Sequence, residues 1–174
     1  MFTTESPKEA PNEAWYALHV RSQHEKSVFA QLDAKSHEAF LPLYSARHKW
    51  ADRWKTVSLP LFPGYVFCRF DISNRSSVLT TSGVIDLVRA GSDPAPIENA
   101  EIETVRAVVA SKLTAEPYCD LIKGQSVRLV SGPLSGVTGT LMEVRSNYRL
   151  MVSVQLLNRS VSVEIERDWV VANN

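Results

Sequence analysis

The segment LPLFPGYVFCRF, residues 59–70, decides the fold because it places a rigid turn directly before an aromatic strand. Proline followed by glycine, at Pro63 and Gly64, is typical of a turn or bulge that ends one strand and begins another. Along the strand that follows, successive side chains face opposite ways. We therefore expect one face of a sheet to carry Tyr65 and Phe67, and the other to carry Val66 and Cys68.

The residues before this segment predict a strand, a helix and a hairpin. Residues 15–20, WYALHV, read as the strand, and Ser22 with Glu25 forms a capping-box pattern for a helix that reaches about His37. A short strand is expected at 40–44. Residues 45–56, SARHKWADRWKT, are polar and basic without helical periodicity, which favours a hairpin tip.

The residues after this segment complete an α+β domain. We expect a short helix at 73–81, a strand at 84–89 and a helix capped by Asn99. The apolar positions of this last helix are Ile102, Val105, Val109 and Leu113. The order β-α-β-β-α-β-α predicts a ferredoxin-like αβ sandwich with one added helix.

The sequence pattern changes after Leu113, where helical periodicity is replaced by short runs rich in strand-forming residues. They fall at 127–130, 137–144, 150–157, 161–165 and 169–171, separated by glycines and polar residues. Five short strands favour a small SH3-like five-stranded β-barrel, because closure removes exposed edges. We expect a polar tail at 1–13, a first domain at 14–112, a linker at 113–122 and the barrel at 123–174.

Composition and motifs limit the functions to be considered. The 174-residue chain has a formal net charge of zero, so nucleic-acid contact requires a local basic patch. No signal peptide or membrane-length apolar run is found, which favours a cytoplasmic protein without membrane contact. No metal-ligand spacing, phosphate loop or nucleophile motif is present in the sequence. We expect a monomer that is not an enzyme and holds no metal or cofactor.

The two halves together resemble the NusG family of transcription elongation factors. WYALHV, a helix and PLFPGYVFCRF resemble its N-terminal domain, and KGQSVRLVSGPLSGVTGTLMEV resembles its KOW domain. The resemblance covers residues 14–172 and implies binding to RNA polymerase through the first domain and to other machinery through the barrel. The basic tip with Trp50 and Trp54 is more similar to specialised paralogues that suppress termination in long operons, such as those for surface polysaccharides.

The resemblance also implies two polymerase contacts. Phe62, Tyr65 and Phe67 would line a hydrophobic depression for the coiled-coil clamp helices of the largest polymerase subunit. A second segment, at a helix start, would touch the polymerase across the cleft, and its residues are Arg75, Ser76 and Ser77. The strand pattern alone leaves a purely structural role open for the three rings. Local capping by Ser73 or Asn74 is the alternative for the second segment.

Two basic surfaces are candidates for nucleic-acid contact. His24, Gln31 and Lys35 share one stripe of the first helix, and Arg21 precedes it. Specialised family members read the non-template DNA strand of the transcription bubble with this surface, so Arg21 and Lys35 would hold phosphates while His24 and Gln31 touch bases. At the hairpin tip, the cations, among them Lys49 and Arg53, alternate with the two tryptophans, a pattern suited to nucleic acid or polymerase. The alternatives are a solvated helix flank and tryptophans folded back onto the sheet.

In the barrel, Leu156 and Leu157 precede an Asn158-Arg159 turn. One of two consecutive strand residues points outward, and the resemblance assigns Leu157 to a protruding position that docks a small-subunit ribosomal protein or the terminator Rho. The β-branched runs favour a permanent barrel, so no switch to a helical form is expected.

An RNA-binding protein is the main alternative. Ferredoxin-like order is also that of the RRM, and Gly64, Tyr65, Phe67 and Phe70 overlap its RNP1 pattern. The pattern departs at Pro63 and Val66. The direction of any effect on transcription is not fixed by the sequence.

Overall fold

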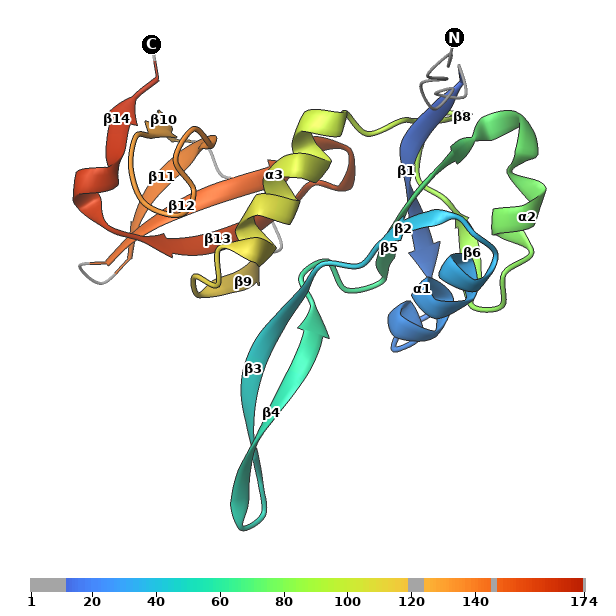
Figure 1. Cartoon of the computed structure of the whole chain (residues 1–174), viewed down its shortest axis with the longest axis horizontal. Coiled ribbons are helices and arrows are strands. Elements are labelled where there is room, and N and C mark those ends of the chain that lie inside the picture. The colour runs from blue at the N-terminus through green and yellow to red at the C-terminus, as the bar shows by residue number, and fades with distance from the viewer. Residues whose placement is uncertain (1–11, 119–123, 145–146, 174) are drawn as a thin grey trace, which may run out of the picture.

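The computed structural model describes residues 12–118, 124–144 and 147–173. Figure 1 shows an N-terminal domain, a C-terminal domain formed mostly of strands, and a long hairpin that projects away from both. The helices and strands of the first domain are β1 (Glu13–Val20), α1 (Glu25–Ala34), β2 (Glu38–Phe40), β3 (Leu43–Trp50), β4 (Arg53–Pro60), β5 (Tyr65–Asp71), α2 (Ser76–Leu79), β6 (Val84–Leu87), β7 (Arg89–Ala90), β8 (Asp93–Pro94) and α3 (Asn99–Ala110).

The main sheet of the first domain confirms the ferredoxin-like prediction. Its strands lie in the order β2-β5-β1-β6, and each neighbouring pair is antiparallel. Val66 and Cys68 are buried in the cluster that includes Val28 of α1 and Val78 of α2. Phe67 is buried in another cluster that contains residues of α3. The predicted alternation along β5 is therefore correct, and helices lie against both faces of this sheet.

The turn before β5 is held by a residue of α1. Gly64 adopts φ 85°, a left-handed conformation that glycine reaches without a steric cost. Its backbone N–H donates to Oε1 of the buried Glu25 at 2.9 Å. The predicted capping box is therefore wrong: His24 is the N-cap, no side chain caps the helix, and Glu25 is directed to the turn instead.

The predicted start and buried face of α3 also need correction. Glu98 occupies the N-cap position, without a side-chain cap, and Asn99 is already helical. Ile102, Val105 and Val108 are buried, whereas 38% of Val109 is exposed. Steps of three residues follow one side of a helix, so Val108 continues the stripe that begins at Ile102.

The second domain contains the five expected strands and one more. They are β9 (Ala115–Tyr118), β10 (Ser126–Leu129), β11 (Thr138–Val144), β12 (Asn147–Val154), β13 (Arg159–Ile165) and β14 (Val170–Ala172), in the sheet order β14-β10-β11-β12-β13-β9. β9 comes from the expected linker. It pairs antiparallel with β13, and Glu116 forms a 3.2 Å ion pair with Arg149 of β12. The part of the expected linker that forms β9 therefore extends this sheet.

Close packing explains one glycine of the KOW-like motif. A Cβ atom at Gly139 in β11 would come within 2.6 Å of the Met151 carbonyl oxygen in β12. A separation this short requires the backbones to move apart, so a residue with a side chain would disturb the strand pair.

One apolar cluster connects the two domains. It contains Trp15 and Phe67 from the sheet, Ile102 from α3, and Val152 and Leu157 from the second domain. A hydrogen bond adds to this packing: the Gln155 backbone N–H donates to Oε1 of Glu101 on α3 at 3.1 Å. The second domain and α3 therefore form one packed layer over this side of the sheet. Within the described residues, no helix has the length and hydropathy to cross a membrane.

Candidate interaction surfaces

The aromatic side of β5 is largely covered in this arrangement. Phe62 and Phe67 are 1% and 0% exposed, and only Tyr65 is partly accessible. The rings of Phe62 and Phe67 meet edge to face with centroids 5.5 Å apart, while Tyr65 lies 5.7 Å from the ring of His19. The expectation that all three rings line an open depression is wrong here, because α3 and the second domain pack on this side. A binding role for the rings remains a prediction.

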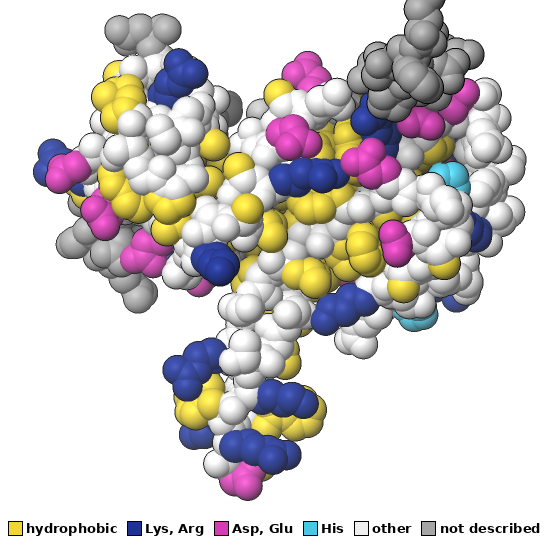
Figure 2. All heavy atoms as spheres, viewed as in Figure 1, with side chains coloured by type: hydrophobic (Ala, Val, Ile, Leu, Met, Phe, Trp, Pro, Cys, Tyr) yellow, Lys and Arg dark blue, Asp and Glu magenta, His cyan; other side chains and the backbone are white. Residues whose placement is uncertain are grey.

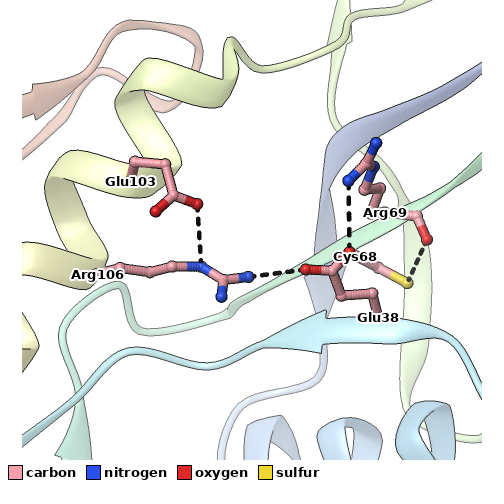
Figure 3. Close-up of polar contacts among 5 residues, drawn as sticks. All are labelled: Glu38, Cys68, Arg69, Glu103 and Arg106. Atoms are coloured by element: carbon pink, nitrogen blue, oxygen red, sulfur yellow. Dashed lines mark hydrogen bonds and ion pairs between the residues drawn. The ribbon is translucent and has the colours of Figure 1, made fainter. Parts of the chain in front are cut away.

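A network centred on Arg106 links α3 to the sheet (Figure 3). Its guanidinium carbon lies 5.2 Å and 5.0 Å from the ring centroids of Trp15 and Phe40, and an Nη atom lies 3.1 Å from Glu38. Arg69 of β5 approaches the same carboxylate at 3.7 Å. The sequence analysis missed this contact because its members are far apart in the chain and form no local pattern.

Cys68 lies beside this network but carries no reactivity of its own. Burial raises the pKa of its thiol to about 12, and the nearby Glu38 carboxylate adds to the effect. The thiol is therefore neutral at physiological pH, and the reading of Cys68 as a small buried hydrophobe is confirmed.

Leu157 does not protrude as expected. Gln155–Leu157 form a 3-10 turn instead of continuing the strand, so the argument from strand alternation does not apply. Only 7% of Leu157 is exposed, and it belongs to the cluster shared with Phe62 and α3. Its role in docking another protein remains a prediction.

The two expected docking surfaces meet at a small cavity. It has a volume of about 160 Å³, and its lining residues are Leu61, Phe62, Pro63, Pro117, Tyr118 and Arg159. The first three residues flank the β5 turn, and the others belong to β9 and β13. The surface expected to bind polymerase and the barrel turn expected to bind a second partner therefore lie against the same interface.

The basic flank of α1 is used mainly for internal contacts. Lys35 Nζ donates to the Ser77 carbonyl oxygen at 2.9 Å and to Thr81 Oγ1 at 2.8 Å. Gln31 Nε2 donates to the Ser82 carbonyl oxygen at 3.1 Å. The predicted stripe exists, but two of its members hold α1 to the segment that contains α2.

The start of this flank is more accessible. Arg21 and His24 are exposed, and the Nδ1 atom of His24 lies 2.9 Å from the Ser22 carbonyl oxygen. Within the described residues, no hydrogen bond or ion pair of the Arg21 side chain is found.

The segment expected to make the second polymerase contact, residues 75–77, is only partly exposed. Arg75 and Ser76 are exposed, whereas the hydroxyl of Ser77 lies 2.9 Å from Nε2 of His37. Neither Ser73 nor Asn74 caps α2, whose N-cap is Arg75 without a side-chain cap. The Asp71 side chain accepts from the Ser73 backbone N–H at 2.9 Å at the start of the preceding 3-10 turn. This leaves Arg75 and Ser76 available to a partner.

The hairpin of β3 and β4 carries an exposed basic surface. Every residue from Arg47 to Thr56 is exposed, including Trp50 at 62% and Trp54 at 60%. The Arg47 guanidinium lies 5.4 Å from the ring centroid of Trp54. Figure 2 shows dark blue basic side chains gathered around yellow hydrophobic ones at the far end of the hairpin. The tryptophans do not fold back onto the sheet.

No metal site is apparent in the part of the chain that the structure describes, where no group of three or more His, Cys, Asp or Glu side chains is suitably placed. The candidate surfaces among the described residues are the covered aromatic side of β5, the α1 flank with its internal hydrogen bonds, the exposed Arg75 and Ser76, and the exposed basic hairpin.

The chain combines a ferredoxin-like domain that carries a projecting hairpin with a second domain built on one six-stranded sheet. The family model described as "Transcription termination factor nusG" matches residues 13–106. The chain therefore belongs to the NusG family.

Relatives match along almost the whole chain. "Transcription termination/antitermination protein NusG" of Thermus thermophilus is 26% identical and covers 90% of this chain and 97% of its own. The protein of the same name from Halalkalibacterium halodurans is 27% identical, with 87% and 94% covered. A solved structure, "Domain interaction in Thermotoga maritima NusG", has a TM-score of 0.58 at 18% identity and covers 94% and 98%. The fold of both domains is thus that of NusG.

Proposed function

We propose that this protein binds RNA polymerase and regulates transcription elongation and termination without acting as an enzyme. The observation that carries this proposal is the two-domain NusG architecture, which relatives named as termination/antitermination proteins share along nearly the whole chain. The exposed basic hairpin supports the finer proposal of a specialised antiterminator of long operons, since it adds a nucleic-acid surface to a protein with no net charge.

Polymerase binding is proposed to centre on Tyr65. Aromatic side chains in a desolvated pocket dominate many interfaces, and each contributes about 2 kcal/mol or more. Phe62 and Phe67 lie in the same cluster, but they are buried beneath α3 and the second domain. Clamp helices would reach these two rings only after that layer has moved, so the proposal includes separation of the barrel from the sheet. Arg75 and Ser76 would make the second polymerase contact.

Nucleic-acid binding is proposed to use two surfaces unequally. Arg21 and His24 are exposed and would contact the non-template strand, whereas Gln31 and Lys35 would position α1. The hairpin cations Lys49 and Arg53 would supply the stronger contact, since they are exposed beside tryptophans. Leu157 would bind a small-subunit ribosomal protein or Rho once the barrel has moved.

The RNA-recognition alternative gains no support from the sheet. An RRM stacks bases on exposed aromatic residues of its sheet, but Phe67 is 0% exposed and packs in the core. Of the three rings, only Tyr65 is therefore partly accessible to unpaired nucleic acid in this arrangement.

The polymerase proposal is tested by co-sedimentation with RNA polymerase. Tyr65→Ala should keep the fold, because Tyr65 is only partly buried, and should weaken binding about tenfold or more. Tyr148→Ala in β12 makes the same change in the second domain and should bind as the unchanged protein does. Full binding by folded Tyr65→Ala would reject the proposed surface. Transcription through a terminator, with and without the protein, gives the direction of the effect.

A further inference from the structure

The outer hairpin is a ribbon with two accessible faces. Directly opposed residues of an antiparallel pair share a face, and successive residues alternate. The register pairs Lys49 with Trp54 and Trp50 with Arg53. The two tryptophans therefore lie on opposite faces of the ribbon, on neighbouring rungs of the ladder. All of these side chains are exposed, so neither face is covered by the rest of the protein.

Each face combines a ring with cations. One face carries Arg47 and Lys49 beside Trp54, and Arg47 lies over that ring. The opposite face carries Arg53 and Lys55 beside Trp50. The arrangement repeats the same chemistry on both sides, whereas a surface built for one strand needs it on one side only. Positive charge attracts phosphate, and an exposed indole ring stacks on a base.

Exposed indoles favour unpaired bases over a duplex. In a duplex the faces of the bases are covered by their neighbours, and proteins reach only base edges and the backbone. An unpaired base offers its whole face to an aromatic side chain. The two rings therefore match two unpaired segments, one on each side of the ribbon.

The turn at the tip disfavours one strand passing around both faces. Ala51 and Asp52 join the strands, and Asp52 is the single acidic residue between Arg47 and Lys55. A strand that wrapped around the end would bring its phosphates past this carboxylate. Figure 2 shows an acidic side chain at the extremity of the hairpin, beyond the basic ones.

We propose that the hairpin tip binds a forked nucleic acid and holds one unpaired strand against each of its faces. Trp50 stacks on a base of one strand and Trp54 on a base of the other, while the cations beside each ring contact the adjacent phosphates. This inference deepens the nucleic-acid part of the proposed function and does not depend on polymerase binding.

The test uses the full-length protein without polymerase and three DNAs: a fork with two unpaired arms, one arm alone, and a blunt duplex of equal length. The fork should bind at least about tenfold more tightly than the single arm, because its two arms engage two linked sites. Trp50→Ala and Trp54→Ala should each lower fork affinity about fivefold or more. Asp52→Lys should strengthen binding of the single arm more than binding of the fork.

Tryptophan fluorescence tests whether both rings contact the fork. The chain has four tryptophans, so Trp15→Phe and Trp169→Phe combined with Trp54→Phe leave Trp50 as the reporter, and Trp50→Phe instead leaves Trp54. One equivalent of fork should quench both reporters. Quenching of only one reporter, duplex binding as tight as fork binding, or no binding to any of the three DNAs would overturn the proposal. Failure of Tyr65→Ala to weaken polymerase binding would leave this result unaffected.

Discussion

The flank of α1 and the tip of the β3–β4 hairpin both present basic side chains in the sequence, but the structure uses them differently. On α1, Lys35 and Gln31 donate hydrogen bonds to the segment around α2. On the hairpin, Lys49, Arg53 and Lys55 are exposed, and the described residues give them no ion pair or hydrogen-bonded partner. Side chains that already donate hydrogen bonds within the fold are less available to a partner than the exposed cations of the hairpin.

The largest expected effect is charge reversal at the tip. Arg53→Glu with Lys55→Glu should weaken binding of the forked DNA at least about tenfold, because two phosphate contacts on one face become repulsive. The dependence of affinity on salt should also become less steep, by about 0.7 in log–log slope for each lost contact. A titration at several salt concentrations measures both quantities.

The matched control for this charge reversal is Arg128→Glu, which changes an exposed arginine of β10. It should leave affinity and salt slope nearly unchanged. Equal losses from both variants would mean that binding follows total charge, and that the hairpin is not a distinct surface.

A smaller effect, on stability and not on DNA binding, is expected from a substitution on α1. Lys35→Met removes both donated hydrogen bonds and should lower the free energy of unfolding by about 1 kcal/mol. DNA affinity should change less than twofold. Chemical denaturation and a binding titration on the same preparation separate the two outcomes.

Lys55→Met provides the reverse case, since it should preserve stability and reduce DNA affinity. If Lys35→Met instead lowers DNA affinity and keeps its stability, the helix flank is the recognition surface. The proposed difference between the flank of α1 and the hairpin would then be wrong.

The smallest expected effect is that of Arg47→Lys. The positive charge is retained, and only the flat contact with Trp54 is altered, which contributes about 0.5–1 kcal/mol at an exposed site. DNA affinity should change by no more than about fivefold. A loss above tenfold would indicate that the Arg47 guanidinium itself contacts bases, which would refine the assignment of that face.

The sequence predicted the features that depend on local patterns. The alternation of Tyr65 and Phe67 against Val66 and Cys68 follows from the two-residue period of a strand, and the two sets lie in separate clusters. The strands of the barrel followed from their β-branched runs and glycines. The basic hairpin was recognisable because its charged and aromatic residues are adjacent in the chain.

The features that the sequence could not predict depend on distant residues. Glu25 matched a capping box, but its partner is Gly64, which lies 39 positions away. The burial of Phe67 and Leu157 depends on packing of α3 and the barrel over the sheet, and no local pattern encodes that packing. The internal partners of Lys35 likewise come from the segment around α2.

Photo-crosslinking in an elongation complex tests directly whether the hairpin tip, and not the flank of α1, contacts nucleic acid. Benzoylphenylalanine replaces Lys35, Trp50 or Trp54 in turn, and the template and non-template strands carry different labels. We expect crosslinks to nucleic acid from positions 50 and 54, each to a different strand, and none from position 35. Crosslinks from position 35 alone, with none from the hairpin, would contradict this expectation.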